Sequence, residues 1–201
     1  MSAALFSLHY LPEINWFVNY LTYENIFVER CENFPKSTFR NRCEIAGANG
    51  KQVLSIPVRG GRDHHQKYFE TKISNVNHWQ KNHWQSIQSA YGSAPFFEFY
   101  EARLKKNYER DFEFLFEFNT EILKTLLKIL KTEKEVQYTK VFEKEIKAMK
   151  DLRSVKKREH VLLPRYYQIF EERNGFISNL SIIDLIFHLG PQAKSFLLHC
   201  S

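Results

Sequence analysis

The stretch "RNRCEIAGANGKQVLSIPV", residues 40–58, restricts the fold more than any other part of the sequence. Its Asn49-Gly50 pair tolerates the positive φ angles that a tight hairpin turn requires. After this turn the apolar residues alternate and share one strand face: Leu54, Ile56 and Val58. Pro57 has no N–H to donate, so the strand lies at a sheet edge or ends there. The stretch therefore predicts an antiparallel hairpin.

Short strands and one helix are predicted around this hairpin. The apolar runs 4–10 and 26–30 have the length of strands. Pro12 suits the first turn of a helix, which Trp16, Phe17, Tyr20 and Leu21 continue at helical spacing. Residues 59–67 are polar and are expected to form a loop, and "FETKISNVN", residues 69–77, is expected to form another strand.

The second half of the chain is predicted to be helical. Asn77 can cap a helix that Gly92 ends, and one apolar stripe runs through residues 96–131. The charged segment 132–160 holds no Gly or Pro and is expected to be helical, with partial mobility as the alternative. Ser181 and Asp184 have capping-box spacing, and Gly190 and Pro191 end one helix and begin the next.

Together these elements predict an α/β or α+β fold in a single domain over residues 1–201. A small sheet in the N-terminal half packs with helices, and the C-terminal half is helical. Of all residues, 43% are hydrophobic, which suffices for a core. Gly is scarce, with 7 residues, and the sequence contains no G-x-G-x-x-G, P-loop or G-x-S-x-G motif. These absences disfavour dinucleotide, kinase-type and lipase-type sites.

The charge and the cysteine content restrict the classes of partner and the cellular compartment that are expected. The net charge is +6, but the signs are mixed along residues 101–160, which argues against nucleic-acid binding. Three cysteines without C-x-x-C spacing fit a reducing compartment, and no apolar run reaches membrane-spanning length. Because no basic, apolar leader opens the sequence, we expect a cytoplasmic protein without a membrane span.

The basic residues before the hairpin are the first candidate site. Lys36, Arg40 and Arg42 surround Asn41. An arginine presents a planar fork that pairs with a carboxylate or a phosphate. We therefore expect these residues to bind an anion. The alternative is a structural salt bridge, for example to Glu29 or Glu44.

The segment "HYLPEINWF", residues 9–17, is the second candidate site. His9 and Tyr10 end a predicted strand just before a helix, where ligands bind in open α/β sheets. His9 can act as acid or base near neutral pH. The alternative is that both side chains form hydrogen bonds at the edge of the core.

Metal and thiol chemistry are not expected. His78 and His83 are five residues apart and do not share a helical face, so the H-x-x-x-H arrangement of a zinc site is missing. His64 and His65 have only Asp63 beside them. Cys43 adjoins Arg42, which can lower a thiol pKa, although a buried inert thiol is the simpler interpretation.

Four segments in this order resemble the WbqC-like protein family, in the form associated with its Bacteroidetes-type branch. They are "HYLPEINWF", "FRNRCEIAGANGKQVLSIPV", "HWQSIQSAYGSAPFFEFY" and "LSIIDLIFHLG". The resemblance covers nearly the whole chain, with residues 132–160 matched least. One departure is that Leu8-His9 stands where other branches carry Gln-Pro or similar residues.

The resemblance implies a transferase of acyl or aminoacyl type that acts on a sugar or nucleotide-sugar in polysaccharide or cell-surface glycan biosynthesis. The expected substrate is a small molecule, a nucleotide-sugar or an acyl donor, and no cofactor is identified. The residues selected are His9 and Tyr10 as catalytic groups and, as anion or substrate ligands, Lys36, Arg40, Asn41, Arg42, Trp16 and Tyr91. The alternative function is a non-catalytic module that binds a protein partner or nucleic acid.

Overall fold

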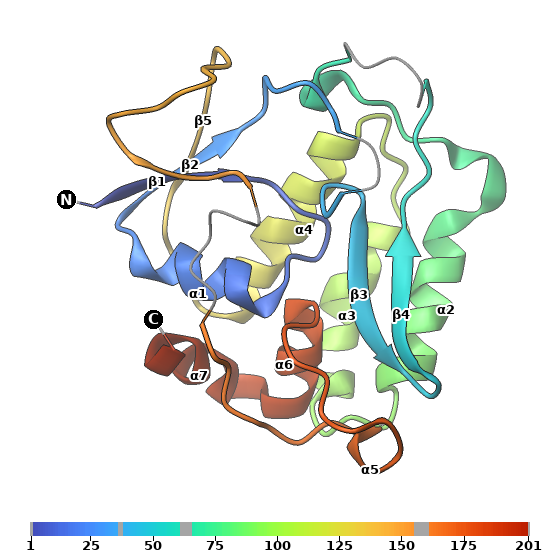
Figure 1. The fold of residues 1–201 in the computed structure, drawn as a ribbon. Helices are drawn as coiled ribbons and strands as arrows, with labels where there is room; N and C mark the ends of the chain where they lie inside the picture. The colour runs from blue at the N-terminus through green and yellow to red at the C-terminus, as the bar shows by residue number, and fades with distance from the viewer. Residues whose placement is uncertain (1, 36–37, 61–65, 155–160, 201) are drawn as a thin grey trace.

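The computed structural model describes residues 2–35, 38–60, 66–154 and 161–200, and a parallel sheet forms one side of the molecule (Figure 1). The sheet has the order β5-β2-β1-β6, with β1 at Ala3–Ser7, β2 at Asn25–Glu29, β5 at Val136–Tyr138 and β6 at Lys150–Leu152. All three pairings are parallel, and Ser7 lies opposite Glu29 at the carboxyl ends of β1 and β2. The predicted strands at 4–10 and 26–30 are confirmed.

Helix α1 (Ile14–Thr22) connects β1 to β2 and covers one face of the sheet (Figure 1). Parallel neighbours need such a crossover, because a tight turn can join only antiparallel strands. Phe6 of β1 packs on Trp16 and Tyr20 of α1, with ring centroids 5.2 and 6.2 Å apart. The predicted helix after Pro12 is therefore confirmed, and its aromatic residues bury one face of the sheet.

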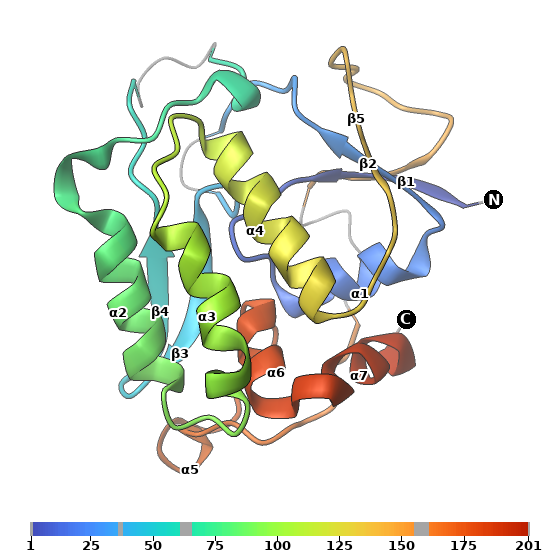
Figure 2. The ribbon, with the colours of Figure 1, turned by 180° about the vertical axis from the view of Figure 1, so that it is seen from behind.

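The predicted hairpin forms a separate two-stranded sheet. Strands β3 (Arg42–Gly47) and β4 (Gly50–Ser55) pair antiparallel, and Gly50 adopts a φ of 101° at the turn. Helices α2 (Trp79–Tyr91) and α3 (Phe97–Tyr108) lie beside this hairpin, as Figure 2 shows from behind. The parallel sheet and the hairpin thus stand at opposite sides of the molecule.

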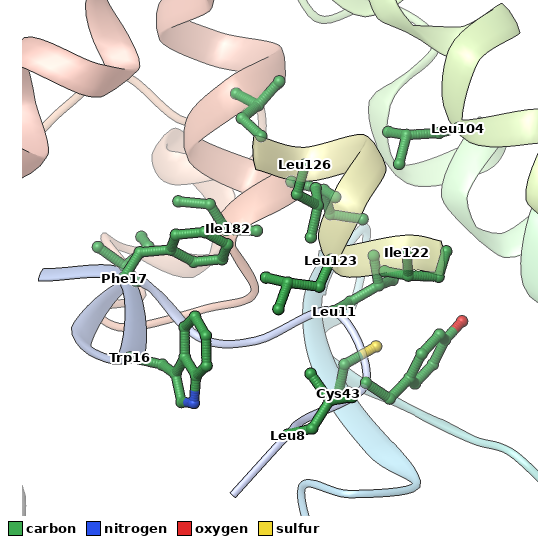
Figure 3. Close-up of a cluster of buried hydrophobic side chains, with 14 of the residues drawn as sticks. Leu8, Leu11, Trp16, Phe17, Cys43, Leu104, Ile122, Leu123, Leu126 and Ile182 are labelled. Carbon is green, nitrogen blue, oxygen red and sulfur yellow. The ribbon is translucent and has the colours of Figure 1, made fainter. Parts of the chain in front are cut away.

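Helix α4 (Leu115–Ile129) lies between these two sides (Figure 2). Its apolar face carries Ile122, Leu123 and Leu126, which meet side chains from the start of the chain and from the C-terminal helix α6 (Ile182–Leu189) (Figure 3). Helices α5 (Glu171–Asn174) and α7 (Ala193–Cys200) complete the C-terminal region. The mixed α/β architecture with a helical C-terminal region is confirmed.

The prediction of a helix within residues 132–160 is wrong. Its described part contains β5 and β6, which add one strand to each edge of the β1–β2 pair. Each of these strands has three residues and no apolar repeat of its own. Their stability comes from pairing with distant strands, which local sequence does not encode.

The prediction of a strand at residues 69–77 is wrong, and the helix predicted over residues 96–131 forms as two helices, α3 and α4, for a shared reason. The single helix is broken after Tyr108, and residues 113–115 run along residues 71–73 instead. Ile73 N–H donates to the Glu113 carbonyl at 2.9 Å, and Leu115 N–H donates to the Thr71 carbonyl at 2.9 Å. Residues 69–77 therefore form two short 3-10 helices, η1 (Tyr68–Glu70) and η2 (Asn75–Asn77), around this contact.

The predicted helix ends agree with the structure for α6 and differ by one residue at the start of α2. The N-cap of α2 is His78, in a left-handed conformation, rather than Asn77. Ser181 caps α6 as predicted, since its Oγ accepts from Ile183 N–H at 3.5 Å, and Gly190 ends that helix with a φ of 54°. In the ranges that the structure describes, no helix combines the length and apolar character needed to cross a membrane.

Candidate functional site

Polar side chains gather where the parallel strands end. β1 ends at Ser7, β2 at Glu29, β5 just before Thr139 and β6 just before Arg153. The carboxyl ends of parallel strands lie at the same edge of the sheet, so these residues lie side by side although they are far apart in the sequence. Ligands of open α/β sheets bind at this edge, so it is the first place to look for a site.

Glu29 is the centre of one buried polar cluster at this edge. Its Oε1 accepts from Cys31 N–H and from the Thr139 hydroxyl, each at 2.7 Å. Its Oε2 lies 3.5 Å from Nη1 of Arg153, whose Nε donates to Asp151 at 2.9 Å. The Glu29 side chain is fully buried. This cluster joins β2, β5 and β6 at their carboxyl ends.

Arg40 belongs to a second buried cluster beside β1. Its Nε and Nη2 donate to the two carboxylate oxygens of Glu32, each at 2.7 Å, and Nη2 also donates to the Ser7 hydroxyl at 2.6 Å. Ser7 in turn donates to Glu32 at 3.0 Å. The fork predicted to hold an anion is thus occupied by Glu32, a partner different from the Glu29 and Glu44 considered above.

His9 lies two residues after the end of β1 and forms a dyad with Glu13. His9 Nδ1 lies 2.9 Å from Oε2 of Glu13, and its ring stacks on Phe39 at 5.5 Å. The intervening Leu11 is buried with a φ of 41°. A left-handed conformation is strained for a bulky residue, and strained residues cluster at active sites and ligand clamps. The dyad can orient the imidazole for proton transfer.

Tyr10 points away from this edge into the core. Its hydroxyl lies 2.9 Å from Nδ1 of His83 and 2.7 Å from the Tyr108 hydroxyl. Burial raises the pKa of Tyr10 well above its ordinary value, with Tyr108 acting in the same direction. Burial lowers the pKa of His83 to about 4, against a smaller opposing effect of the Ser55 carbonyl. Tyr10, His83 and Tyr108 therefore form a buried chain of hydrogen bonds whose members are uncharged at neutral pH.

Replacing His83 with glutamine is expected to reduce the acid sensitivity of folding. Between about pH 4 and about pH 6.5 the unfolded chain binds a proton at His83 and the folded chain does not, so stability falls as the pH falls. The loss amounts to about 3 kcal/mol at most. Glutamine can still accept from Tyr10 but does not titrate. Urea unfolding of both proteins at about pH 7 and about pH 5 measures the difference; equal pH slopes would contradict the assignment.

The other selected residues are divided between these clusters and the core. Asn41 donates through Nδ2 to the Ile56 carbonyl at 3.1 Å, and Arg42 begins β3 opposite Ser55. Trp16 is buried in α1, with Nε1 donating to the Ser7 carbonyl at 3.0 Å. Tyr91 is buried beside α6 and accepts from Ala46 N–H at 3.2 Å. Lys36 lies outside the described residues, as do Asp63, His64 and His65.

Of the selected residues, His9 and Arg40 lie in one neighbourhood. Tyr10 N–H donates to the Phe39 carbonyl at 2.8 Å, which holds the two segments together. Tyr91 lies apart, against Phe187 and His188 of α6. The first and second candidate segments therefore meet. Their side chains are buried, and each is paired with a carboxylate, His9 with Glu13 and Arg40 with Glu32.

An open pocket adjoins the carboxyl ends of β2 and β5, and we call it the basic pocket. Its volume is about 850 Å³. It is lined by Arg30, Cys31, Lys67, Phe69, Glu70, Tyr138, Thr139, Lys140, Val141 and Phe142. Three of these side chains are cations and one is an anion. The pocket therefore favours a negatively charged ligand.

Among the cations of the basic pocket, Arg30 is held in position by its neighbours. Its guanidinium lies 4.8 Å from the centroid of the Phe69 ring, and its backbone N–H donates to the Thr139 hydroxyl at 3.2 Å. Its Nε is buried and donates to no residue in the described ranges. A buried donor without a partner is costly, so a ligand oxygen at this position would be stabilising.

Sequence reasoning did not select the lining of the basic pocket. Arg30 ends a predicted strand and Cys31 follows it, which is the same signal that selected His9 and Tyr10. Thr139 and Lys140 gave no such signal, because the strand before them was not predicted. The described residues contain no group of three or more metal-ligating side chains. Burial raises the pKa of Cys43, with Glu44 acting in the same direction, so this thiol is not activated by Arg42.

Comparison with known proteins gives a family match and a partial relative. Residues 8–162 match the model described as "WbqC-like protein family". The "Uncharacterized protein Rv1507c" of Mycobacterium tuberculosis (strain ATCC 25618 / H37Rv) is 28% identical over 94 residues, which are 47% of this chain and 40% of that protein. The chain thus aligns with less than half of that relative's length. No solved structure matches the chain.

Proposed function

Since the chain belongs to the WbqC-like protein family, we propose that it is a transferase of acyl or aminoacyl type that acts on a sugar or nucleotide-sugar in polysaccharide or cell-surface glycan biosynthesis. The basic pocket holds the anionic part of the donor or the acceptor. One observation carries this assignment: Arg30 presents a buried Nε that donates to none of the described residues, in a pocket at the carboxyl edge of a parallel sheet.

Each ligand group has a proposed place. Arg30, Lys67 and Lys140 supply the positive charge for a phosphate or carboxylate. Phe69 and Phe142 offer ring faces beside it, which suit a base or a sugar ring. The anion is assigned to these cations and not to Arg40, because the Arg40 fork is already filled by Glu32.

His9 is proposed to move the proton during transfer. Attack of a sugar hydroxyl or amine on an acyl carbonyl releases a proton, and the expelled leaving group takes one up. The imidazole can accept the first proton and deliver the second, while the Glu13 carboxylate 2.9 Å away stabilises the imidazolium. His9 is almost fully buried, so the step requires a conformational change that exposes the imidazole ring to the substrate.

Replacing Arg30 with alanine is expected to weaken binding of an anionic ligand about 10- to 100-fold, the value of one charge-assisted hydrogen bond. A thermal-shift screen with nucleotide-sugars, acyl-CoA esters, amino acids and simple phosphates identifies the ligand class. Titration of that ligand into the wild type and Arg30→Ala then gives the ratio of dissociation constants. Lys106→Ala is the matched control, because Lys106 is exposed on α3 and lines none of the pockets described above.

Turnover separates a transferase from a binding module. The ligand found in the screen is incubated with candidate acceptors, and the products are weighed by mass spectrometry. We expect product with the wild type and none with His9→Gln, whose ligand affinity stays unchanged. Ligand binding without turnover for any acceptor would favour a non-catalytic module, and a flat screen or unchanged affinity in Arg30→Ala would refute the proposal.

A further inference from the structure

A second pocket lies on the sheet face that α1 does not cover, and we call it the apolar pocket. Its volume is about 870 Å³. Its apolar lining includes Leu5 and Phe27 of the sheet and Ile146, Ala148 and Met149 of the segment before β6. The charged residues Glu143, Glu145 and Lys147 also line it. The segment 138–149 supplies most of the lining and forms no helix. A volume of this size, within the range of roughly 300–1,000 Å³, suits a small-molecule ligand.

Glu29 stands in the wall of the apolar pocket with one oxygen unsatisfied. Its Oε1 accepts from Cys31 and Thr139, whereas its Oε2 receives no hydrogen bond from any residue in the described ranges. Arg153 Nη1 is at 3.5 Å from this oxygen, an ion-pair contact that leaves a hydrogen-bonding position open. Burying a carboxylate oxygen without a donor is costly, so a ligand that donates here would be favoured.

The two pockets share one wall. Tyr138, Thr139, Lys140 and Val141 line both of them. Thr139 also joins the two sides chemically, since its hydroxyl donates to Glu29 and accepts from the backbone N–H of Arg30. The segment 138–141 therefore lies between a pocket that favours an anion and a pocket that is mainly apolar.

We propose that the apolar pocket binds an acyl group that carries a hydroxyl or amino substituent, with Glu29 Oε2 accepting the hydrogen bond from that substituent. The inference rests on the proposed function, because it specifies the chemistry of the acyl group to be transferred. The apolar lining binds the hydrocarbon part, and the buried carboxylate selects the substituted chain over the plain one. A hydrocarbon without a donor leaves Glu29 Oε2 without a hydrogen bond.

The experiment compares matched acyl probes by isothermal titration. The probes are the N-acetylcysteamine thioesters of octanoate, of 3-hydroxyoctanoate and of 3-amino-octanoate, which carry no phosphate. We expect each substituted probe to bind about 10-fold more tightly than the octanoyl probe, as one hydrogen bond to a charged group provides. Glu29→Gln is expected to remove most of this preference while both substituted probes still bind.

Ile146→Asp tests the pocket without touching Glu29. A charge at this apolar lining position is expected to weaken the binding of all three probes more than 10-fold, whereas Ile146→Leu is expected to bind them as the wild type does. The matched control is Val76→Ala, because Val76 is 77% exposed in η2 and lines neither pocket. Equal affinity for the plain and substituted probes, or unchanged binding in Ile146→Asp, would overturn the inference.

Failure of this inference can be told apart from failure of the proposed function. The probes lack a phosphate, so Arg30→Ala should leave their affinity unchanged. Probe binding that depends on Ile146 and Glu29, without any turnover, supports the inference and refutes the transferase. Nucleotide-sugar turnover that depends on Arg30, with no probe binding, supports the transferase and refutes the inference.

Discussion

Arg40→Ala is expected to destabilise the folded chain by about 3–5 kcal/mol, because it leaves the buried Glu32 carboxylate without its cation. Both nitrogens that face Glu32 donate at 2.7 Å, and both side chains are nearly excluded from solvent. Ser7 also loses a donor, since Arg40 Nη2 contacts its hydroxyl at 2.6 Å. Urea unfolding at neutral pH, compared with the wild type, gives the change in free energy.

A double variant separates a broken ion pair from a general loss of packing. Arg40→Met with Glu32→Leu removes both charges and keeps apolar volume, and is expected to recover most of the loss. If the double variant is as unstable as Arg40→Ala, the stability comes from contacts other than the pair. If Arg40→Ala is fully stable but loses ligand affinity, Arg40 is a ligand-binding residue, as its Arg-Asn-Arg sequence first suggested.

Gly190→Ala is the second large effect, with an expected loss of about 4 kcal/mol that combines backbone strain with overpacking. Gly190 ends α6 with φ 54° and ψ −123°, a conformation that residues with a Cβ rarely adopt. An added Cβ would lie 2.5 Å from Cγ and Cδ1 of Phe96. Phe96 cannot retreat freely, because its N–H donates to the Phe187 carbonyl of α6 at 3.0 Å.

Gly175→Ala is the matched control for this prediction. Gly175 also has a positive φ, 72°, but an added Cβ there meets no atom within 4 Å. Gly175→Ala should therefore lose only the free energy of backbone strain, about 1–3 kcal/mol. Thermal or urea unfolding of both variants gives the difference that belongs to Phe96. Equal losses in the two variants would mean that the Phe96 ring moves aside at little cost.

The sequence predicted the elements whose cause lies within a few neighbouring residues. Asn49-Gly50 set the hairpin turn, because glycine alone accepts a φ of 101° there without strain. Pro12 and the aromatic spacing after it predicted α1, and Ser181 and Gly190 predicted the two ends of α6. For the site, the position of His9 and Tyr10 at a strand end was predicted by the same local logic.

The tertiary structure alone decided which distant segments pair and which charges remain unpaired. Residues 136–138 and 150–152 become strands because β2 and β1 offer them open edges, and Thr139 is brought to Glu29 only by that pairing. Arg40 and Arg30 look alike in sequence, yet burial gives Arg40 a carboxylate partner and leaves the Nε of Arg30 without one among the described residues. Local sequence therefore determined the turns and helix ends, which depend on backbone conformation, whereas the site depends on long-range contacts that only the folded chain supplies.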